Sequence, residues 1–124
     1  MLGAQFCSEI LFTKQVSLQN FDKIGMIVQN KIQKEELKPP FIKAVADIEK
    51  EIISVDCELH IDCAEELVRE GSEWKNLWGF NIYPDASVDF ISLINIRPAS
   101  RNRSMEIQNP KIRQKIESIF QKLL

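Results

Sequence analysis

The chain has 124 residues, of which 44% are hydrophobic and 27% are charged, and this length fits one folded domain. Its net charge of −2 gives no general attraction to nucleic acid or to anionic lipid, so both are unfavoured as partners. No apolar run approaches the ~20 residues that a membrane-spanning helix needs. Met1–Phe12 lacks the basic start and apolar stretch of an export signal, so we expect a cytoplasmic protein that binds no membrane.

The residues before position 41 predict one strand and one helix. Glu9–Val16 is rich in β-branched and aromatic residues, which is typical of a strand. Ser17 is a suitable N-cap, because its hydroxyl can accept a hydrogen bond from a free helix N–H. A helix to about Gln33 follows from the apolar residues that recur at helical spacing, which are Leu18, Phe21, Ile24, Val28 and Ile32. Pro39-Pro40 excludes helix in the loop that comes next.

Four further strands are predicted in two hairpins. Phe41–Ile48 and Glu51–Val55 form the first pair, and Leu77–Tyr83 and Val88–Arg97 form the second, with Pro84-Asp85 in its turn. Val88–Arg97 carries apolar residues on both alternating faces, which indicates a central strand.

Two more helices follow from capping signals. Asp62 predicts the N-cap of a helix over Cys63–Glu70, with Glu65 completing a capping box and Gly71 in the left-handed position after its end. Asn109-Pro110 supplies the N-cap and first residue of the last helix. The apolar stripe of that last helix is Ile112, Ile116, Ile119 and Leu123.

The element order is therefore β-α-β-β-α-β-β-α. It predicts a single α+β domain over residues 1–124, with a mostly antiparallel sheet of four to five strands and three helices packed on one face. Residues 1–40 form its N-terminal strand and helix, and residues 41–124 form its core. No glycine-rich phosphate loop follows a strand, which disfavours a Rossmann or Walker nucleotide site.

The chain has three cysteines, Cys7, Cys57 and Cys63. An odd number without an export signal predicts reduced thiols and no disulfide framework. Cys57, His60 and Cys63 form a C-x2-H-x2-C pattern whose ligand types suit zinc, but no second ligand pair matches it. Small buried thiols are the simpler interpretation.

Several short segments, in order and at matching spacing, resemble a family of short bacterial proteins carried as a domain of unknown function. They lie between Phe41 and the C-terminus and are Asp47-Ile48-Glu49-Lys50, Glu58-Leu59-His60, Asp62, Gly71-Ser72, Leu77-Trp78-Gly79, Asn81, Tyr83-Pro84, Ser92-Leu93-Ile94-Asn95-Ile96-Arg97-Pro98 and Asn102-Arg103-Ser104. The resemblance makes residues 1–40 the more divergent part, and it implies no established activity.

The chain departs from the pattern of that family at three places. Asp56-Cys57 stands where the family has Gly-Gly, Ala64 stands where it has an acid, and Arg101 stands where it has glycine. The C-x2-H-x2-C pattern thus belongs to this sequence and not to the family, which further disfavours zinc. The sequence gives no clear sign of a cofactor. A divalent metal ion is the one candidate that we keep.

The candidate catalytic residues are Glu58, His60 and Arg97. In an extended chain Glu58, His60 and Asp62 would share one face. His60, the only histidine, could then act as general base, and the two carboxylates could hold Mg²⁺ or Mn²⁺ beside it. Arg97 could bind a phosphate or carboxylate with two hydrogen bonds. The alternatives are a capping role for Asp62, a solvated Glu58, a His60 bonded to loop backbone, and an Arg97 salt bridge.

Further candidate binding residues are Trp78, Tyr83 and Asn102-Arg103-Ser104, in addition to Asp62. Trp78 also fits a buried strand face, which it would share with Phe80 and Ile82. Asn102 and Ser104 also fit a role in shaping their loop. Trp74 lies in a polar stretch, where an exposed tryptophan would mark a contact surface.

Three functions remain in competition. The first is a small enzyme or a ligand-binding or metal-binding domain acting on a small anionic substrate. The second is a non-catalytic module that self-associates as a homo-oligomer, with Trp74 or a sheet edge at the contact. The third and weakest is an RNA-binding accessory protein that uses Arg97, Arg101 and Arg103.

Overall fold

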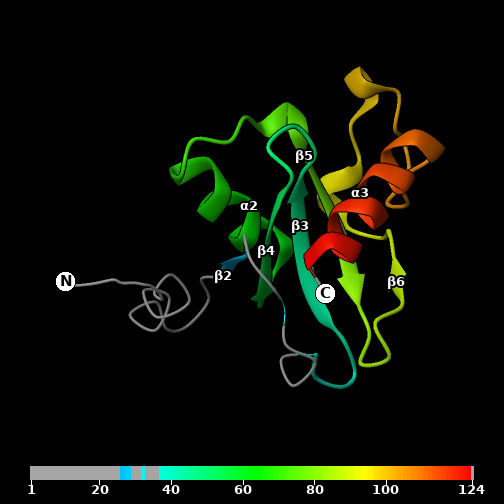
Figure 1. Ribbon diagram of the computed structural model, residues 1–124. Coiled ribbons are helices and arrows are strands. Elements are labelled where there is room, and N and C mark those ends of the chain that lie inside the picture. Colours follow the sequence, from blue (N-terminus) through cyan, green and yellow to red (C-terminus); the bar gives the residue numbers. More distant parts are fainter. Residues whose placement is uncertain (1–25, 29–31, 33–36, 124) are drawn as a thin grey trace.

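The computed structural model describes residues 26–28, 32 and 37–123 (Figure 1). Their strands form one antiparallel sheet in the order β2-β4-β3-β5-β6. The strands are β2 (Met26–Val28), β3 (Ile42–Asp47), β4 (Ile52–Cys57), β5 (Leu77–Ile82) and β6 (Val88–Asp89). The helices are α2 (His60–Arg69) and α3 (Pro110–Leu123), with short 3-10 turns η2 (Trp74–Asn76), η3 (Leu93–Asn95) and η4 (Pro98–Ser100).

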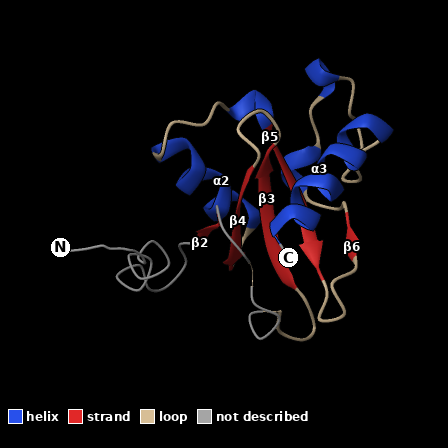
Figure 2. Ribbon diagram, viewed as in Figure 1, coloured by secondary structure: helices blue, strands red, loops and turns tan. Residues whose placement is uncertain are grey.

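The α+β class and the antiparallel sheet are as predicted, but the number of helices and the faces on which they pack are not. The described residues contain two α-helices, where three were predicted. These two also pack on opposite faces of the sheet, which corrects the expectation that the helices share one face. Figures 1 and 2 show α3 in front of the sheet and α2 behind it. No helix in the described ranges is long and apolar enough to cross a membrane.

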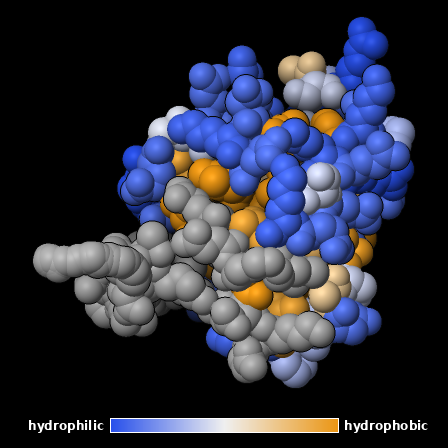
Figure 3. Space-filling model, viewed as in Figure 1, coloured by the Kyte–Doolittle hydropathy of each residue, from blue (hydrophilic) through white to orange (hydrophobic). Residues whose placement is uncertain are grey.

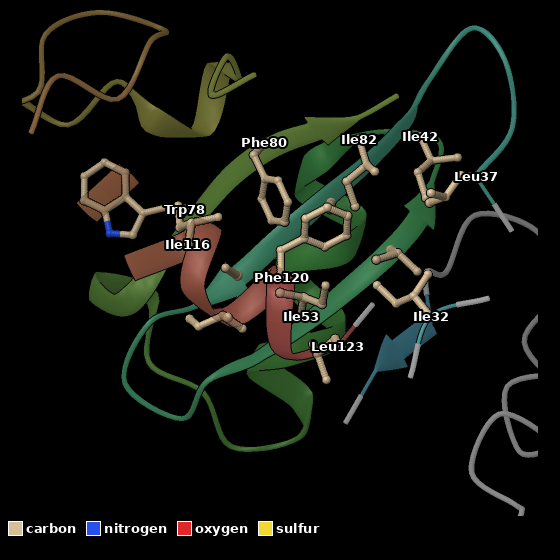
Figure 4. Packing of buried hydrophobic residues seen from close by; sticks show 14 of the residues in the cluster. Ile32, Leu37, Ile42, Ile53, Trp78, Phe80, Ile82, Ile116, Phe120 and Leu123 are labelled. Atoms are coloured by element: carbon tan, nitrogen blue, oxygen red, sulfur yellow. The ribbon is translucent and has the colours of Figure 1, made fainter. Parts of the chain in front are cut away.

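The larger hydrophobic core lies between α3 and the sheet (Figure 4). Alternate residues of β5, namely Trp78, Phe80 and Ile82, point toward α3, as predicted for one strand face. Ile116 and Phe120 of α3 pack onto them, with the Phe80 and Phe120 rings 6.4 Å apart in an edge-to-face arrangement. The predicted α3 stripe is therefore confirmed. The alternation leaves the other residues of β3 and β5 on the α2 face.

The outer side of α3 is polar. Hydrophilic residues predominate around α3 in the space-filling view (Figure 3). The Glu51 carboxylate, in the β3–β4 turn, accepts hydrogen bonds from Lys115 at 2.7 Å and Lys122 at 2.9 Å. These two ammonium groups lower the pKa of Glu51 to about 2. At the start of α3, the Asn109 side chain accepts from the Lys111 N–H at 2.8 Å, which confirms the predicted N-cap.

The smaller core lies under α2. Cys63, Ala64 and Leu67 of the helix pack onto Val45 of β3 and Leu77 of β5. Below the helix end, the buried Asp47 carboxylate accepts from the Ser72 hydroxyl at 2.6 Å and from two backbone N–H groups of the β3–β4 turn.

Both ends of α2 are informative. The helix begins at His60 with Leu59 as N-cap, so the predicted N-cap at Asp62 and the capping box with Glu65 are wrong. Asp62 is instead the third helical residue, and its carboxylate accepts from the Leu59 N–H at 3.2 Å. The C-terminal prediction is confirmed, because Gly71 has φ of +107°. Two hydrogen bonds from the residues after the helix, one from Gly71 and one from Ser72, make this end a Schellman motif.

The N-terminal predictions have different outcomes. Glu9–Val16 lies outside the described residues. The helix predicted to Gln33 is wrong at Met26–Val28, which is strand β2 and pairs antiparallel with β4. The Phe41–Ile48 and Glu51–Val55 hairpin is confirmed as β3 and β4.

The strand predicted over Val88–Arg97 is largely wrong, because only Val88–Asp89 pairs with β5. Beyond Asp89 a side chain replaces the strand. The Asn95 amide accepts from the Gly79 N–H at 2.8 Å and donates to the Gly79 carbonyl at 3.0 Å. A side-chain amide thus supplies the pair of hydrogen bonds that a neighbouring strand would supply. The Leu77–Tyr83 prediction is confirmed as β5.

The expectation of reduced thiols is also wrong, since Cys57 and Cys63 form a disulfide. A β-bulge makes this pairing feasible. Lys43 of β3 lies opposite Cys57, whereas the next residue, Ala44, lies opposite Val55. Asp56 is therefore the extra residue, and the bulge turns the Cys57 side chain onto the α2 face.

Two of the departures from the family pattern fall on strained backbone. Asp56 has φ of +65° and Arg101 has φ of +61°, and the family resemblance implies glycine at both positions. Only glycine adopts this conformation without a steric cost. We therefore expect Arg101→Gly to raise the free energy of unfolding by about 0.5–1 kcal/mol in urea denaturation.

The matched control for that substitution is Arg101→Ala. Alanine removes the same exposed side chain but keeps the Cβ that causes the strain, so no gain is expected. An equal gain from both substitutions would assign the effect to the arginine side chain and contradict the backbone explanation.

Candidate functional site

A cavity of about 370 Å³ lies on the α2 face of the sheet, beyond the N-terminal end of α2. We call it the His60 pocket. Strands β3 and β5, the start of α2 and the segment after β6 all contribute to it. Its lining residues are Phe41, Lys43, Leu59, His60, Ile61, Asn81, Ile91, Ser92, Leu93, Ile94 and Met105.

The register between β3 and β5 determines which polar side chains face the pocket. Lys43 on β3 pairs directly with Asn81 on β5, so both side chains lie on the same face. The half-buried Lys43 places its ammonium 5.6 Å from the centre of the Phe41 ring. None of the described carboxylates lies within ion-pair distance of that ammonium. Among the described residues, this charge is therefore not neutralised by an ion pair.

His60 leans over β5 from the first residue of α2. Its Nε2 lies 3.0 Å from the Phe80 carbonyl oxygen. A carbonyl only accepts, so Nε2 carries the proton and Nδ1 of the neutral ring is an acceptor. Burial lowers the pKa of His60 below its usual range, and the Lys43 ammonium adds to this. The Phe80 carbonyl and the neighbouring Asn81 side chain act in the opposite direction without reversing the shift.

The Asn81 amide is held in one orientation. Its Nδ2 donates to Asp89 Oδ1 at 2.7 Å and to the Ile91 carbonyl at 3.0 Å, so the nitrogen is fixed by two acceptors. The other Asp89 oxygen accepts from the Tyr83 hydroxyl at 2.5 Å. The buried Asn81 Oδ1 has no hydrogen-bond partner of good geometry, although the Asn81 side chain lies close enough to His60 to raise the pKa of that ring. The residue is only 6% exposed. An unsatisfied buried acceptor is rare and requires an explanation.

Glu58, His60 and Asp62, which were predicted to share one face, have different environments in the structure. They lie at a helix start, so the shared face expected of an extended segment is wrong. Glu58 is exposed and does not line the pocket, and the Asp62 carboxylate serves the helix N-terminus. Within the described ranges, no group of three or more His, Cys, Asp or Glu side chains is placed to hold a metal ion.

The Arg97 guanidinium forms hydrogen bonds with backbone carbonyl groups. It donates to the carbonyls of Ile94 at 3.0 Å, of Trp74 at 3.0 Å and of Leu77, and it lies 4.4 Å from the centre of the Trp78 ring. These hydrogen bonds occupy guanidinium N–H groups that would otherwise be free to bind an anion. Trp78 itself is buried in the core, and Tyr83 supports Asp89.

Asn102-Arg103-Ser104 shapes its loop. The Nδ2 of the buried Asn102 lies 2.8–3.0 Å from the carbonyl oxygens of Asn95, Ser104 and Glu106, which share its two N–H groups. Ser104 Oγ accepts from a backbone N–H, and Arg103 is exposed. None of the three lines the His60 pocket.

The sequence analysis named His60 as a candidate residue but did not name Lys43, Asn81 or Gly79, which line or border the His60 pocket. A signal existed for the first two. Each is a polar residue within a mostly apolar strand, Ile42–Asp47 or Leu77–Ile82, at a position facing away from the main core. Gly79 is needed because a Cβ there would lie 3.2 Å from His60 Cδ2 and closer still to Ser92.

The lowered pKa of His60 gives a pH prediction. The unfolded chain binds a proton at His60 with pKa near 6.5, whereas the folded chain binds it only at lower pH. Between these two values the unfolded state holds more protons, so stability falls as pH decreases from about 7 through the folded pKa. His60→Gln should flatten this part of the profile, measured by urea denaturation between pH 5 and 8.

The NMR titration of the single histidine checks the same prediction directly. A His60 pKa at or above that of a histidine peptide would contradict the burial of the imidazole.

The chain matches the family described as protein of unknown function (DUF5674) over residues 24–123. No curated protein and no solved structure matches it. The matched region contains β3 and β5, which form the floor of the His60 pocket, and α2, which carries His60. The chain therefore belongs to the DUF5674 family, whose function is unknown.

Proposed function

We propose that the protein binds a small, largely apolar molecule that carries one anionic group and one hydrogen-bond donor, and that it does so in the His60 pocket. The observation that carries this proposal is Asn81, whose side chain contributes to the cavity lining and whose buried Oδ1 has no hydrogen-bond partner. A ligand N–H or O–H would satisfy it and remove the cost of leaving a buried acceptor unpaired.

The other polar groups support the same ligand chemistry. The Lys43 ammonium has no carboxylate partner among the described residues and favours an anion. His60 is neutral near pH 7, so its Nδ1 accepts a hydrogen bond and adds no second positive charge. The remaining lining residues are mostly apolar. A few converging polar groups in an apolar cavity of this size are typical of small-molecule sites.

The test uses small carboxylic acids and their primary amides as probes. Phenylacetate, indole-3-acetate and hexanoate are titrated into the full chain while the imidazole signals of His60, the only histidine, are followed by NMR. We expect at least one acid to shift these signals and to bind about 5-fold more tightly than its amide. Failure of every probe to move the His60 signals would contradict the proposal.

Two lysine variants separate the pocket charge from the general charge of the protein. Lys43→Met should make acid and amide bind equally. Lys111→Met removes an exposed lysine from α3, on the opposite face of the sheet, and should preserve the preference for the acid. A preference that survives in Lys43→Met would exclude this ammonium as the partner of the anion.

A further inference from the structure

A second hollow of about 310 Å³ lies next to the His60 pocket. We call it the Trp74 hollow, and its lining residues are Ile61, Trp74, Lys75, Ile94 and Arg97. Ile61 and Ile94 line both hollows, so the two lie side by side with these residues between them.

Exposed apolar side chains gather around these two hollows. Seven large hydrophobic residues of the described chain are exposed, and six of them line one hollow or the other. Leu93 is 70% exposed, Leu59 is 58% exposed and Trp74 is 46% exposed. Five of these six residues line the His60 pocket, whereas Trp74 lines only the Trp74 hollow, so a ligand confined to the pocket would leave Trp74 uncovered. An exposed apolar area of this kind marks a contact with a larger partner.

The charges of the two hollows select the partner. Their lining residues include Lys43, Lys75 and Arg97, and no aspartate or glutamate. Lys75 has only an exposed ion pair, with Glu73 at 3.5 Å, and such pairs contribute little. A second copy of the chain placed face to face would bring these positive charges together, which disfavours the self-association considered above. An acidic partner is attracted instead.

We propose that the His60 pocket and the Trp74 hollow form one groove that binds an extended acidic segment of another protein. One apolar side chain of the segment occupies each hollow, and acidic groups of the segment lie near Lys43 and Lys75. A backbone N–H of the segment supplies the donor that Asn81 Oδ1 lacks. This inference rests on the proposed function, because it identifies the anionic, apolar ligand of the His60 pocket as part of a peptide.

The experiment selects a displayed library of random 12-residue peptides on the immobilised full chain. We expect enriched sequences to contain two apolar residues with aspartate or glutamate around them. The most enriched sequence is then synthesised with a fluorescent label, and its affinity is measured by anisotropy. Trp74→Ala and Lys75→Glu should each weaken binding by about 10-fold or more. Lys111→Glu on α3 should leave the affinity unchanged.

Three results would overturn this inference. The library yields no enriched sequence, the enriched peptides bind Trp74→Ala and Lys75→Glu as tightly as the unsubstituted chain, or light scattering detects a dimer that Leu93→Asp dissociates. The last result would assign the groove to a second copy.

The outcome is distinguishable from that of the proposed function. Trp74 and Lys75 do not line the His60 pocket, so Trp74→Ala and Lys75→Glu should leave the binding of small acids unchanged. Small acids that bind without any enriched peptide support the proposed function and exclude the groove. A peptide that depends on Trp74 and Lys75 supports the groove even where no small acid binds.

Discussion

Asn95→Ala is expected to lower the free energy of unfolding by about 3–4 kcal/mol. The Asn95 side chain is fully buried and pairs with both backbone groups of Gly79. Its Nδ2 also lies within hydrogen-bond distance of the carbonyls of Phe90 at 3.3 Å and Met105 at 3.1 Å. Alanine leaves these backbone groups buried without a partner, and each such group costs about 1–3 kcal/mol before any relaxation.

Urea denaturation measures this loss, and two further variants define its cause. Asn95→Asp keeps an acceptor for the Gly79 N–H but loses every donor and places a carboxylate beside carbonyl oxygens, so it should destabilise at least as much. Asn109→Ala removes an exposed N-cap and should cost only about 1 kcal/mol. A loss at Asn95→Ala no larger than that at Asn109→Ala would mean that this amide is not the attachment of the segment to β5.

Asn95 also explains why the strand predicted over Val88–Arg97 is mostly absent. The apolar residues of Val88–Arg97 alternate as a central strand would, yet β6 ends at Asp89. The hydrogen-bonding edge of β5 at Gly79 is occupied by a side-chain amide instead of a strand. Hydrophobic periodicity records which residues are buried, and it does not record which polar groups satisfy the backbone. Strand-like alternation is therefore produced here by an irregular segment that is buried.

The correctly predicted elements are those whose sequence pattern lies entirely within the element itself. Strand β5 has alternate apolar residues on the core face, and α3 has both an Asn-Pro start and an apolar stripe. The start of α2 lacks such a local signal. An acid in the first helical turn is favourable at more than one position, so Asp62 fits the third residue as well as the N-cap.

The disulfide and the pocket depend on the register with which strands pair. Cys57 reaches Cys63 because Asp56 forms a bulge, and Lys43 reaches Asn81 because of the register of β3 on β5. The sequence indicates His60 as a candidate site residue because it is the only histidine. The partners of His60 follow only from the register of β3 on β5, which joins residues far apart in the sequence and is not visible in a local pattern.

Gly79→Ala is expected to be the second large effect, with a loss of about 2–4 kcal/mol in the free energy of unfolding. An added Cβ would lie 2.6 Å from Ser92 Cβ and 2.7 Å from Ser92 Oγ. Ser92 is only 2% exposed, and its Cβ moves only with its backbone, so the segment carrying Asn95 must shift away from β5. His60 Cδ2, 3.2 Å from the added carbon, should shift as well.

A double-mutant cycle identifies the contact that causes this loss. Ser92→Gly removes both atoms that the new methyl group would meet, so Gly79→Ala should cost at least about 1 kcal/mol less in the Ser92→Gly background. Ser92→Gly alone loses the hydrogen bond from the Ile94 N–H to Ser92 Oγ, which the cycle subtracts. The NMR signals of His60 should move in Gly79→Ala and return toward their original positions in the double variant. A Gly79→Ala protein with unchanged stability and unchanged His60 signals would mean that the segment from Ser92 to Asn95 does not pack on β5, and the His60 pocket would then lose one of its walls.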